Sequence, residues 1–163
     1  MQIQDLDDLH PIDLVQSLAT SKDWVFERTH YDQIAVVVEG LWQQYAISLV
    51  WSEASETLRL VCSFEFSPPP ARLPELYETL NLANDSCWKG AFAYWQDQQC
   101  MAYIYGLNLS GGAVASTAQV DDMLKIAVAT SEKLYPAFQL VSWGGDTPKA
   151  AMQVAINDGY GRA

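Results

Sequence analysis

The order of apolar and polar positions divides the chain into segments of helical period and segments of strand period. Residues 10–21 repeat apolar positions at helical spacing after an opening His10-Pro11, which predicts a short helix. From residue 24 to residue 66 the period is two, as it is for side chains along a strand. Breaks in that pattern predict turns at residues 31–32, 39–40 and 53–56.

The alternation makes one face of the predicted sheet strongly apolar and the other mixed. The apolar face takes every second residue of two long strands: Tyr45, Ile47, Leu49 and Trp51 on the first, and Leu58, Leu60, Cys62, Phe64 and Phe66 on the second. A parallel sheet with helices on both sides would be apolar on both faces. The pattern therefore favours an antiparallel meander with one face against a helical layer.

The second half of the chain predicts helices on either side of another hairpin. The segment Ser67-Pro68-Pro69-Pro70 ends the sheet, because proline donates no hydrogen bond to a strand ladder. A helix is expected over about residues 73–86. The hairpin follows, with strands at residues 91–95 and 101–109 and a turn at 96–99.

A glycine-containing break at residues 110–113 precedes the last helical region, which begins near Thr117. Pro136 is expected to bend or interrupt this helix, and Gly144-Gly145 to end it. Thr147-Pro148 then opens another helix. Residues 1–9 and 158–163 are expected to be loose termini. The order of elements predicts a single α+β domain over residues 1–163, with an antiparallel sheet of two hairpin or meander segments covered by helices.

Charge limits the partners that the chain is expected to bind. Twenty Asp and Glu residues against nine Lys and Arg give a net charge of -11, which repels the phosphates of nucleic acids and of anionic lipids. The first eight residues are acidic and precede no apolar stretch of the length found in a secretion signal or a membrane span. We therefore expect a cytoplasmic protein that binds neither nucleic acid nor membranes.

The residue types that usually carry catalysis or bind metals are few and scattered. His10 and His30 are the only histidines, and each lies at the border of a predicted element, where a solvated histidine is the usual case. Cys62, Cys87 and Cys100 are odd in number and widely spaced, which predicts buried thiols rather than disulfides or zinc ligands. We therefore expect no catalytic residue, no metal and no cofactor, and a protein that is not an enzyme.

The aromatic residues are the unusual feature of the composition. The chain has six Trp, eight Tyr and five Phe, and Trp42, Trp88, Trp95 and Trp143 lie near the ends of predicted elements. Packing at the rim of a core is the commoner role of such residues, but a partly exposed ring can also anchor a partner. The four tryptophans therefore make an interaction surface a better hypothesis than an active site.

The mixed face of the predicted sheet suggests that the chain pairs with itself. This face carries Val50, Val61, Ala102 and Ile104 among its polar residues. Apolar side chains that no helix covers are commonly buried by a partner. A homodimer is therefore expected.

Four segments resemble the YbjN family of bacterial sensory transduction regulators. They are residues 40–42, 76–84, 87–90 and 135–145, and the last of them ends in Trp143-Gly144-Gly145. The resemblance implies a fold similar to that of type III secretion chaperones, in which helices cover an antiparallel sheet and the protein commonly forms a homodimer. It implies no catalytic residue that could be carried over to this chain.

Two functions are compatible with these observations. The first is a non-enzymatic regulatory or chaperone-like domain that binds a protein partner not identified by the sequence. The alternative is a small-molecule-binding or enzymatic domain with a pocket between the sheet and the helices.

Overall fold

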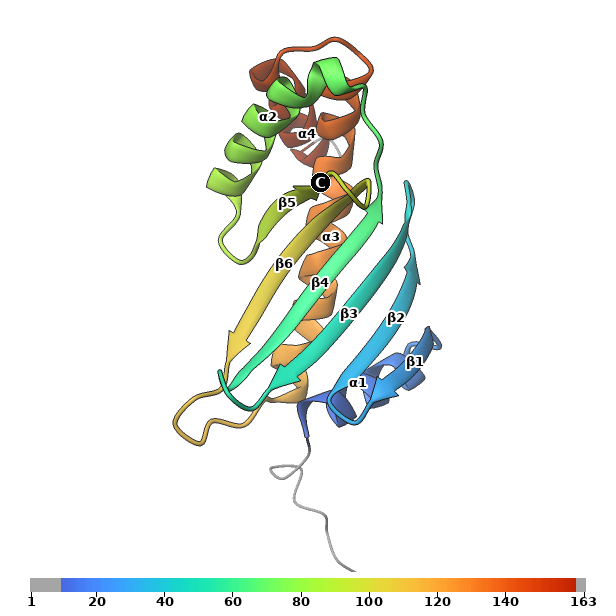
Figure 1. Ribbon diagram of the computed structural model, residues 1–163, viewed down its shortest axis with the longest axis vertical. Coiled ribbons are helices and arrows are strands. Elements are labelled where there is room, and N and C mark those ends of the chain that lie inside the picture. The colour runs from blue at the N-terminus through green and yellow to red at the C-terminus, as the bar shows by residue number, and fades with distance from the viewer. Residues whose placement is uncertain (1–9, 161–163) are drawn as a thin grey trace, which may run out of the picture.

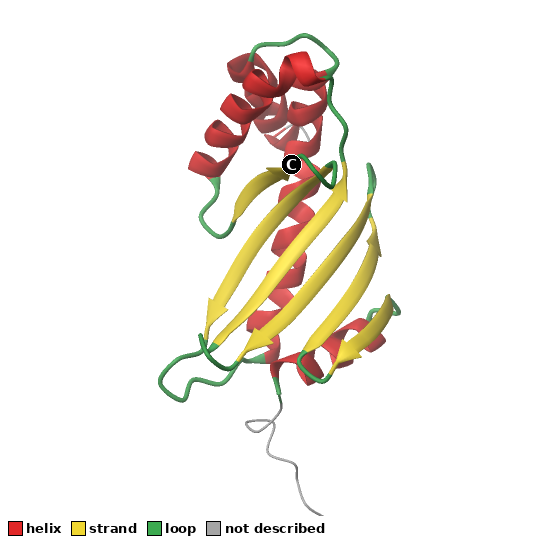
Figure 2. Cartoon of the chain, in the orientation of Figure 1, coloured by secondary structure: helices red, strands yellow, loops and turns green. Residues whose placement is uncertain are grey.

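The computed structural model describes residues 10–160 and contains a six-stranded sheet with four α-helices (Figures 1 and 2). The strands are β1 (Val25–His30), β2 (Gln33–Glu39), β3 (Gln44–Ser52), β4 (Thr57–Glu65), β5 (Ala91–Trp95) and β6 (Cys100–Asn108). The helices are α1 (Pro11–Ser21), α2 (Leu73–Ser86), α3 (Thr117–Ser142) and α4 (Pro148–Tyr160), and a short 3-10 helix, η2 (Pro70–Arg72), precedes α2.

The sheet has the strand order β1-β2-β3-β4-β6-β5, and each neighbouring pair is antiparallel. Helix α3 crosses behind the sheet and extends past its end, where α2 and α4 pack around it (Figure 1). Helix α1 lies at the opposite end, against β1, β2 and β3. This arrangement confirms the predicted α+β class with its antiparallel sheet.

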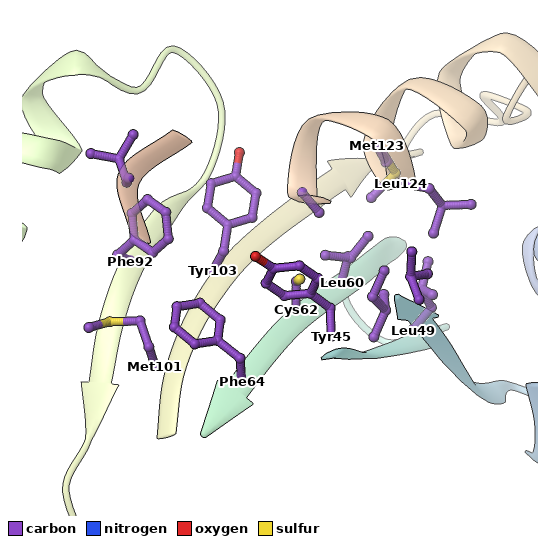
Figure 3. Close-up of a cluster of buried hydrophobic side chains, with 14 of the residues drawn as sticks. Tyr45, Leu49, Leu60, Cys62, Phe64, Phe92, Met101, Tyr103, Met123 and Leu124 are labelled. Carbon is purple, nitrogen blue, oxygen red and sulfur yellow. The ribbon is translucent and has the colours of Figure 1, made fainter. Parts of the chain in front are cut away.

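The core lies between the sheet and α3. Its sheet side consists of the alternate residues that the sequence assigns to the apolar face, and α3 contributes Met123 and Leu124 opposite them (Figure 3). Aromatic rings meet edge to face within it, with centroids 5.6 Å apart for Tyr45 and Phe64. Each fully buried side chain of this size contributes about 1.5–3 kcal/mol to the free energy of folding. In Figure 3 the side chains of Tyr45, Leu49 and Leu60 on the sheet gather with Met123 and Leu124 of α3 between sheet and helix.

Helix α3 continues without interruption from Thr117 to Ser142, with Pro136 inside it. The sequence predicts a bend or an interruption at Pro136, and the interruption does not occur. Proline removes one helical hydrogen bond and costs about 3 kcal/mol in a helix interior. The turns on both sides of it are held by burial, because Tyr135, Ala137 and Phe138 all lie in the core.

Of the predicted loose termini, only residues 158–160 fall within the described part of the chain. Helix α4 runs to Tyr160 and so includes residues 158–160, which the pattern placed in the tail. Its start agrees with the prediction, since the Thr147 hydroxyl accepts a hydrogen bond from the backbone N–H of Ala150 at 3.3 Å. Residues 1–9 and 161–163 lie outside the described part.

Helix α1 begins with a histidine cap. His10 Nδ1 accepts a hydrogen bond from the backbone N–H of Ile12 at 3.2 Å. The ring is half-buried, not solvated as expected, and its centroid lies 4.8 Å from that of Tyr31 and 6.3 Å from that of Trp51. Burial is the main cause that lowers the pKa of His10 below its usual value of 6.5.

We predict that His10 makes stability depend on pH in mildly acidic solution. Protonation puts a hydrogen on Nδ1 and removes the acceptor of the cap. Because the folded pKa is below 6.5, the unfolded chain binds this proton more readily. The contribution of neutral His10 to the free energy of unfolding is therefore complete above about pH 6.5, and it is lost as the pH falls through the folded pKa of His10.

The measurement is the free energy of unfolding in urea across this pH range. His10→Asn keeps a capping side chain that does not titrate, so its stability should change less with pH than that of the wild type. His30→Asn, at the exposed end of β1, is the matched control and should retain the wild-type slope. Equal slopes for His10→Asn and the wild type would rule out His10 as the source.

Candidate functional site

Two of the tryptophans selected from the sequence lie at the two ends of one chain of rings. Trp42 stacks on Tyr135 with centroids 6.4 Å apart, Tyr135 lies 6.3 Å from Phe66, and Phe66 lies 5.1 Å from Trp143. The middle rings are buried, whereas Trp42 is 47% exposed, Trp143 is 54% exposed and the adjacent Leu41 is 70% exposed. We call Leu41, Trp42, Phe66, Tyr135 and Trp143 the aromatic surface.

The hairpin between β2 and β3 holds Leu41 and Trp42 in place. Its turn is closed by a hydrogen bond of 2.8 Å from the Gly40 N–H to the Gln43 carbonyl. Glu132 Oε1, on α3, accepts hydrogen bonds from the backbone N–H groups of Leu41 at 2.6 Å and Trp42 at 3.5 Å. A side chain at residue 40 would overlap this oxygen, so the contact requires glycine there. The hairpin is thus tied to α3 by a charged acceptor.

Tyr135 connects the hairpin to α3 at a second point. Its hydroxyl oxygen accepts hydrogen bonds from Gln43 Nε2 at 3.0 Å and from Gln139 Nε2 at 3.2 Å. The ring is buried against Phe64 and Phe66 and supports the half-exposed ring of Trp42. Trp42 therefore rests on a fixed base.

Trp143 is held by the end of α3. Its backbone N–H donates to the Gln139 carbonyl at 2.8 Å, and Gly145 has a φ of 71°, which favours glycine after a helix end. Arg72 Nε donates to the Val141 carbonyl at 2.9 Å, and Arg72 Nη2 donates to the Asp146 carbonyl at 3.0 Å. The guanidinium therefore fixes the chain on both sides of Trp143.

The groups around the aromatic surface are mainly acidic or neutral. Glu39 at the end of β2 and Glu65 at the end of β4 are exposed, and Glu132 is half-buried. Burial and the nearby Glu132 carboxylate raise the pKa of the Tyr45 hydroxyl, which stays protonated at physiological pH. The aromatic surface offers rings and amides to a ligand rather than a nucleophile or a base.

The other two selected tryptophans lie elsewhere. Trp88 is on the loop between α2 and β5, and Trp95 ends β5. Trp95 is half-buried, and the alternation along β5 places it opposite the inward-facing Phe92 and Tyr94, on the side of the sheet away from α3. The four residues therefore do not form one site, and their binding role stays a prediction.

Four residues of this region are missing from the set chosen by sequence: Leu41, Phe66, Glu132 and Tyr135. Leu41 has a signal that could have been used, because two large apolar residues follow each other in a turn between strands. Tyr135 and Glu132 have none, because their helical positions do not show that a hairpin 90 residues earlier in the chain lies against them.

The residues with catalytic potential are dispersed. Cys62 is buried, its Sγ lies 3.8 Å from Ser131 Oγ, and burial raises the pKa of its thiol to about 12. Cys87 and Cys100 are half-buried, less than the sequence predicted, and all three thiols are free. His30 is exposed as expected. Within residues 10–160 no three His, Cys, Asp or Glu side chains are grouped as metal ligands, and no helix is long and apolar enough to cross a membrane.

Comparison with known proteins gives a family. Residues 11–140 match the model of the YbjN family, described as "Putative bacterial sensory transduction regulator". The chain belongs to the YbjN family. The match confirms the resemblance, but it ends before Trp143-Gly144-Gly145, so this part of the supporting motif lies outside the matched residues. None of the curated proteins compared with the chain matches it.

A solved structure of the family has a similar fold. It is described as "Crystal structure of YbjN, a putative transcription regulator from E. coli". The TM-score is 0.53 at 10% identity, over 74% of this chain and 85% of the other. This similarity supports the fold alone, and the expected likeness to type III secretion chaperones stays a prediction.

We predict that Gly40 and Glu132 are energetically coupled. Gly40→Ala should destabilise the fold by about 1–3 kcal/mol through overpacking. Glu132→Ala should cost about 1.5–3 kcal/mol by removing a charged acceptor. The double variant should cost less than the sum, because truncating Glu132 removes the nearer of the two side chains that the added methyl group would overlap, while the Tyr45 ring remains.

Urea denaturation of the four proteins in this cycle measures the coupling. Lys133→Ala, at the exposed neighbour of Glu132 on α3, is the control and should change stability by less than about 0.5 kcal/mol. Strict additivity would show that the glycine and the carboxylate do not interact as described.

Proposed function

We propose that this member of the YbjN family is a non-enzymatic regulatory domain that binds a protein segment through the aromatic surface. The observation that carries the proposal is the pair of half-exposed tryptophans at the ends of one supported chain of rings. Tryptophan is among the residues that contribute most binding energy in protein interfaces. Leu41 and Trp42 are adjacent in the turn and both exposed, and exposed apolar side chains grouped in this way are typical of interaction sites.

The rigidity of the aromatic surface supports the same conclusion. Glu132 holds the hairpin of Trp42, and Arg72 holds the helix end of Trp143. Binding costs conformational entropy when side chains must first be ordered. A surface whose backbone is already fixed loses less on binding, so its exposed rings are suited to recognise one kind of partner.

The setting that we propose is the cytoplasm, with a protein as the partner. Three free cysteines and no disulfide among the described residues suit a reducing compartment. A net charge of -11 opposes contact with nucleic acid or with an anionic membrane. The family description names a regulator, which is consistent with action through binding rather than catalysis.

We predict that Trp42 and Trp143 carry the binding energy. Selection of a displayed library of random peptides on the wild-type protein supplies a ligand whose sequence can be read directly. Trp42→Ala and Trp143→Ala should each weaken the selected peptides by about tenfold or more, as for truncated hot-spot residues. Calorimetry with the purified peptide measures the effect.

Trp88→Ala is the matched control, because it removes an exposed tryptophan from a different place. It should leave the affinity unchanged. The proposal fails if no peptide is selected, or if Trp88→Ala weakens binding as much as Trp42→Ala and Trp143→Ala do.

We also propose that two copies of the chain pair through the face of the sheet away from α3. Across β3, β4 and β6 this face carries Val50, Val61 and Ile104, whereas Ala102, which the sequence also placed there, is buried. A hollow of about 410 Å³ on this face is lined by Val50 and Val61 together with Ser48, Ser52, Thr57 and Arg59. Six strands of this length cover roughly 25 Å by 25 Å, or about 1,200 Å² for two copies. This is at the lower end of the range for stable protein interfaces.

We predict that Val61→Glu disrupts this homodimer, because it places charges near the middle of the paired faces. Light scattering should then give twice the mass of one chain for the wild type and the single mass for Val61→Glu at micromolar concentration. Val154→Glu, on the exposed side of α4, is the control and should remain paired. A wild-type monomer throughout this range would contradict the pairing.

A further inference from the structure

A second hollow, of about 260 Å³, opens between the loop that follows α2 and the middle of α3. It is separate from the aromatic surface and is not the pocket that the alternative function would place between sheet and helices. The end of α2 supplies Ser86, the loop supplies Cys87, Trp88 and Lys89, and α3 supplies Ile126, Thr130, Lys133 and Leu134.

The loop that carries Trp88 has a fixed base. The Tyr103 hydroxyl donates a hydrogen bond to the Lys89 carbonyl, and a side chain at Gly90, whose φ is 69°, would overlap the Tyr103 ring. Asn84 Oδ1 also accepts a hydrogen bond from the Phe92 N–H at 2.7 Å, and Asn84 Nδ2 donates one to the Phe92 carbonyl at 3.1 Å. Trp88 is nevertheless fully exposed. A held loop therefore presents an unpacked indole beside the hollow.

The charge at this hollow is opposite to that of the whole chain. Two of the nine cationic residues, Lys89 and Lys133, line it in a protein of net charge -11. Lys133 has no acidic partner within 4.0 Å among the described residues. Lys89 contacts Asp122 at 3.1 Å, but both side chains are about half exposed, so this ion pair is weak and can be exchanged.

The remaining lining suits a molecule with an apolar part. Ile126 and Leu134 provide aliphatic walls, and Thr130 adds a hydroxyl. The last carbonyls of α2 could repel an anion, but two of them already accept hydrogen bonds: Ala83 from Ser86 Oγ at 2.7 Å, and Asn84 from the Cys87 N–H at 3.1 Å. The lysines therefore set the local charge.

We propose that this hollow binds a small molecule with an anionic group on a flat apolar body. The anion, a carboxylate or a phosphate, pairs with Lys133, which has no acidic partner among the described residues, and Lys89 adds positive charge to the lining. The flat body lies against Trp88 and the aliphatic walls. The volume is slightly below the usual range for ligand pockets, which restricts the ligand to about the size of one substituted ring. This site does not depend on protein binding at the aromatic surface.

The test uses phenyl phosphate as the probe and amide and indole chemical shifts as the readout. Shifts of the Trp88 indole N–H and of the Lys89 and Thr130 amides should saturate with a millimolar dissociation constant. Inorganic phosphate and benzyl alcohol each carry only one half of the proposed ligand, so each should bind about tenfold more weakly or not at all.

Two variants and one control locate the site. Lys133→Gln and Trp88→Ala should each weaken phenyl phosphate by about fivefold or more, since each removes one half of the recognition. Lys149→Gln removes an exposed lysine on α4 and should have no effect. Both variants change exposed residues, and their unchanged spectra away from the hollow would confirm the fold.

Three results would overturn the proposal. The first is the absence of saturable shifts with phenyl phosphate. The second is binding of benzyl alcohol as tight as that of phenyl phosphate, which would show that the lysines play no role. The third is an equal loss of affinity for phenyl phosphate in Lys133→Gln and Lys149→Gln, which would show a general attraction of the anion to lysines rather than a site. Saturation only by an acidic peptide would assign the hollow to a protein partner instead and would also contradict the proposal.

Discussion

The burial of one face of an antiparallel sheet against a single long helix is the constraint on which the rest of the structure depends. The registers of β3, β4 and β6 place Leu49, Leu60 and Tyr105 side by side on that face, and α3 covers it. Because α3 is longer than the part that covers the sheet, its last turns extend beyond the edge and support α2 and α4 (Figure 1).

The position of α3 also determines the candidate surface. Glu132, Tyr135 and Trp143 lie within eleven residues of each other at the end of this helix, while Phe138 between them is buried in the core. An interruption at Pro136 would separate the residues that hold the Trp42 hairpin from Trp143. Core packing on both sides of the proline thus preserves the geometry of the aromatic surface as well as the fold.

The predictions that succeeded are those that depend on local physics. Alternation identifies which side chains of β3 and β4 face the core, because the pleat has a period of two wherever a strand forms. Thr147 and Pro148 mark the start of α4, because capping involves only adjacent residues. Pro136 does not interrupt α3, because a proline in a helix interior costs only a few kcal/mol of stability. Burial of the neighbouring side chains stabilises the helix by more than this.

The sequence by itself determined the α+β class, the inward face of each long strand and the family to which the chain belongs. It also marked Trp42 and Trp143 as residues near element ends. The tertiary structure alone decided that these two rings belong to one surface and that Trp88 stands apart, beside two lysines. Contacts between residues about 90 positions apart leave no periodic trace in the chain, because they depend on where the sheet places a hairpin relative to α3.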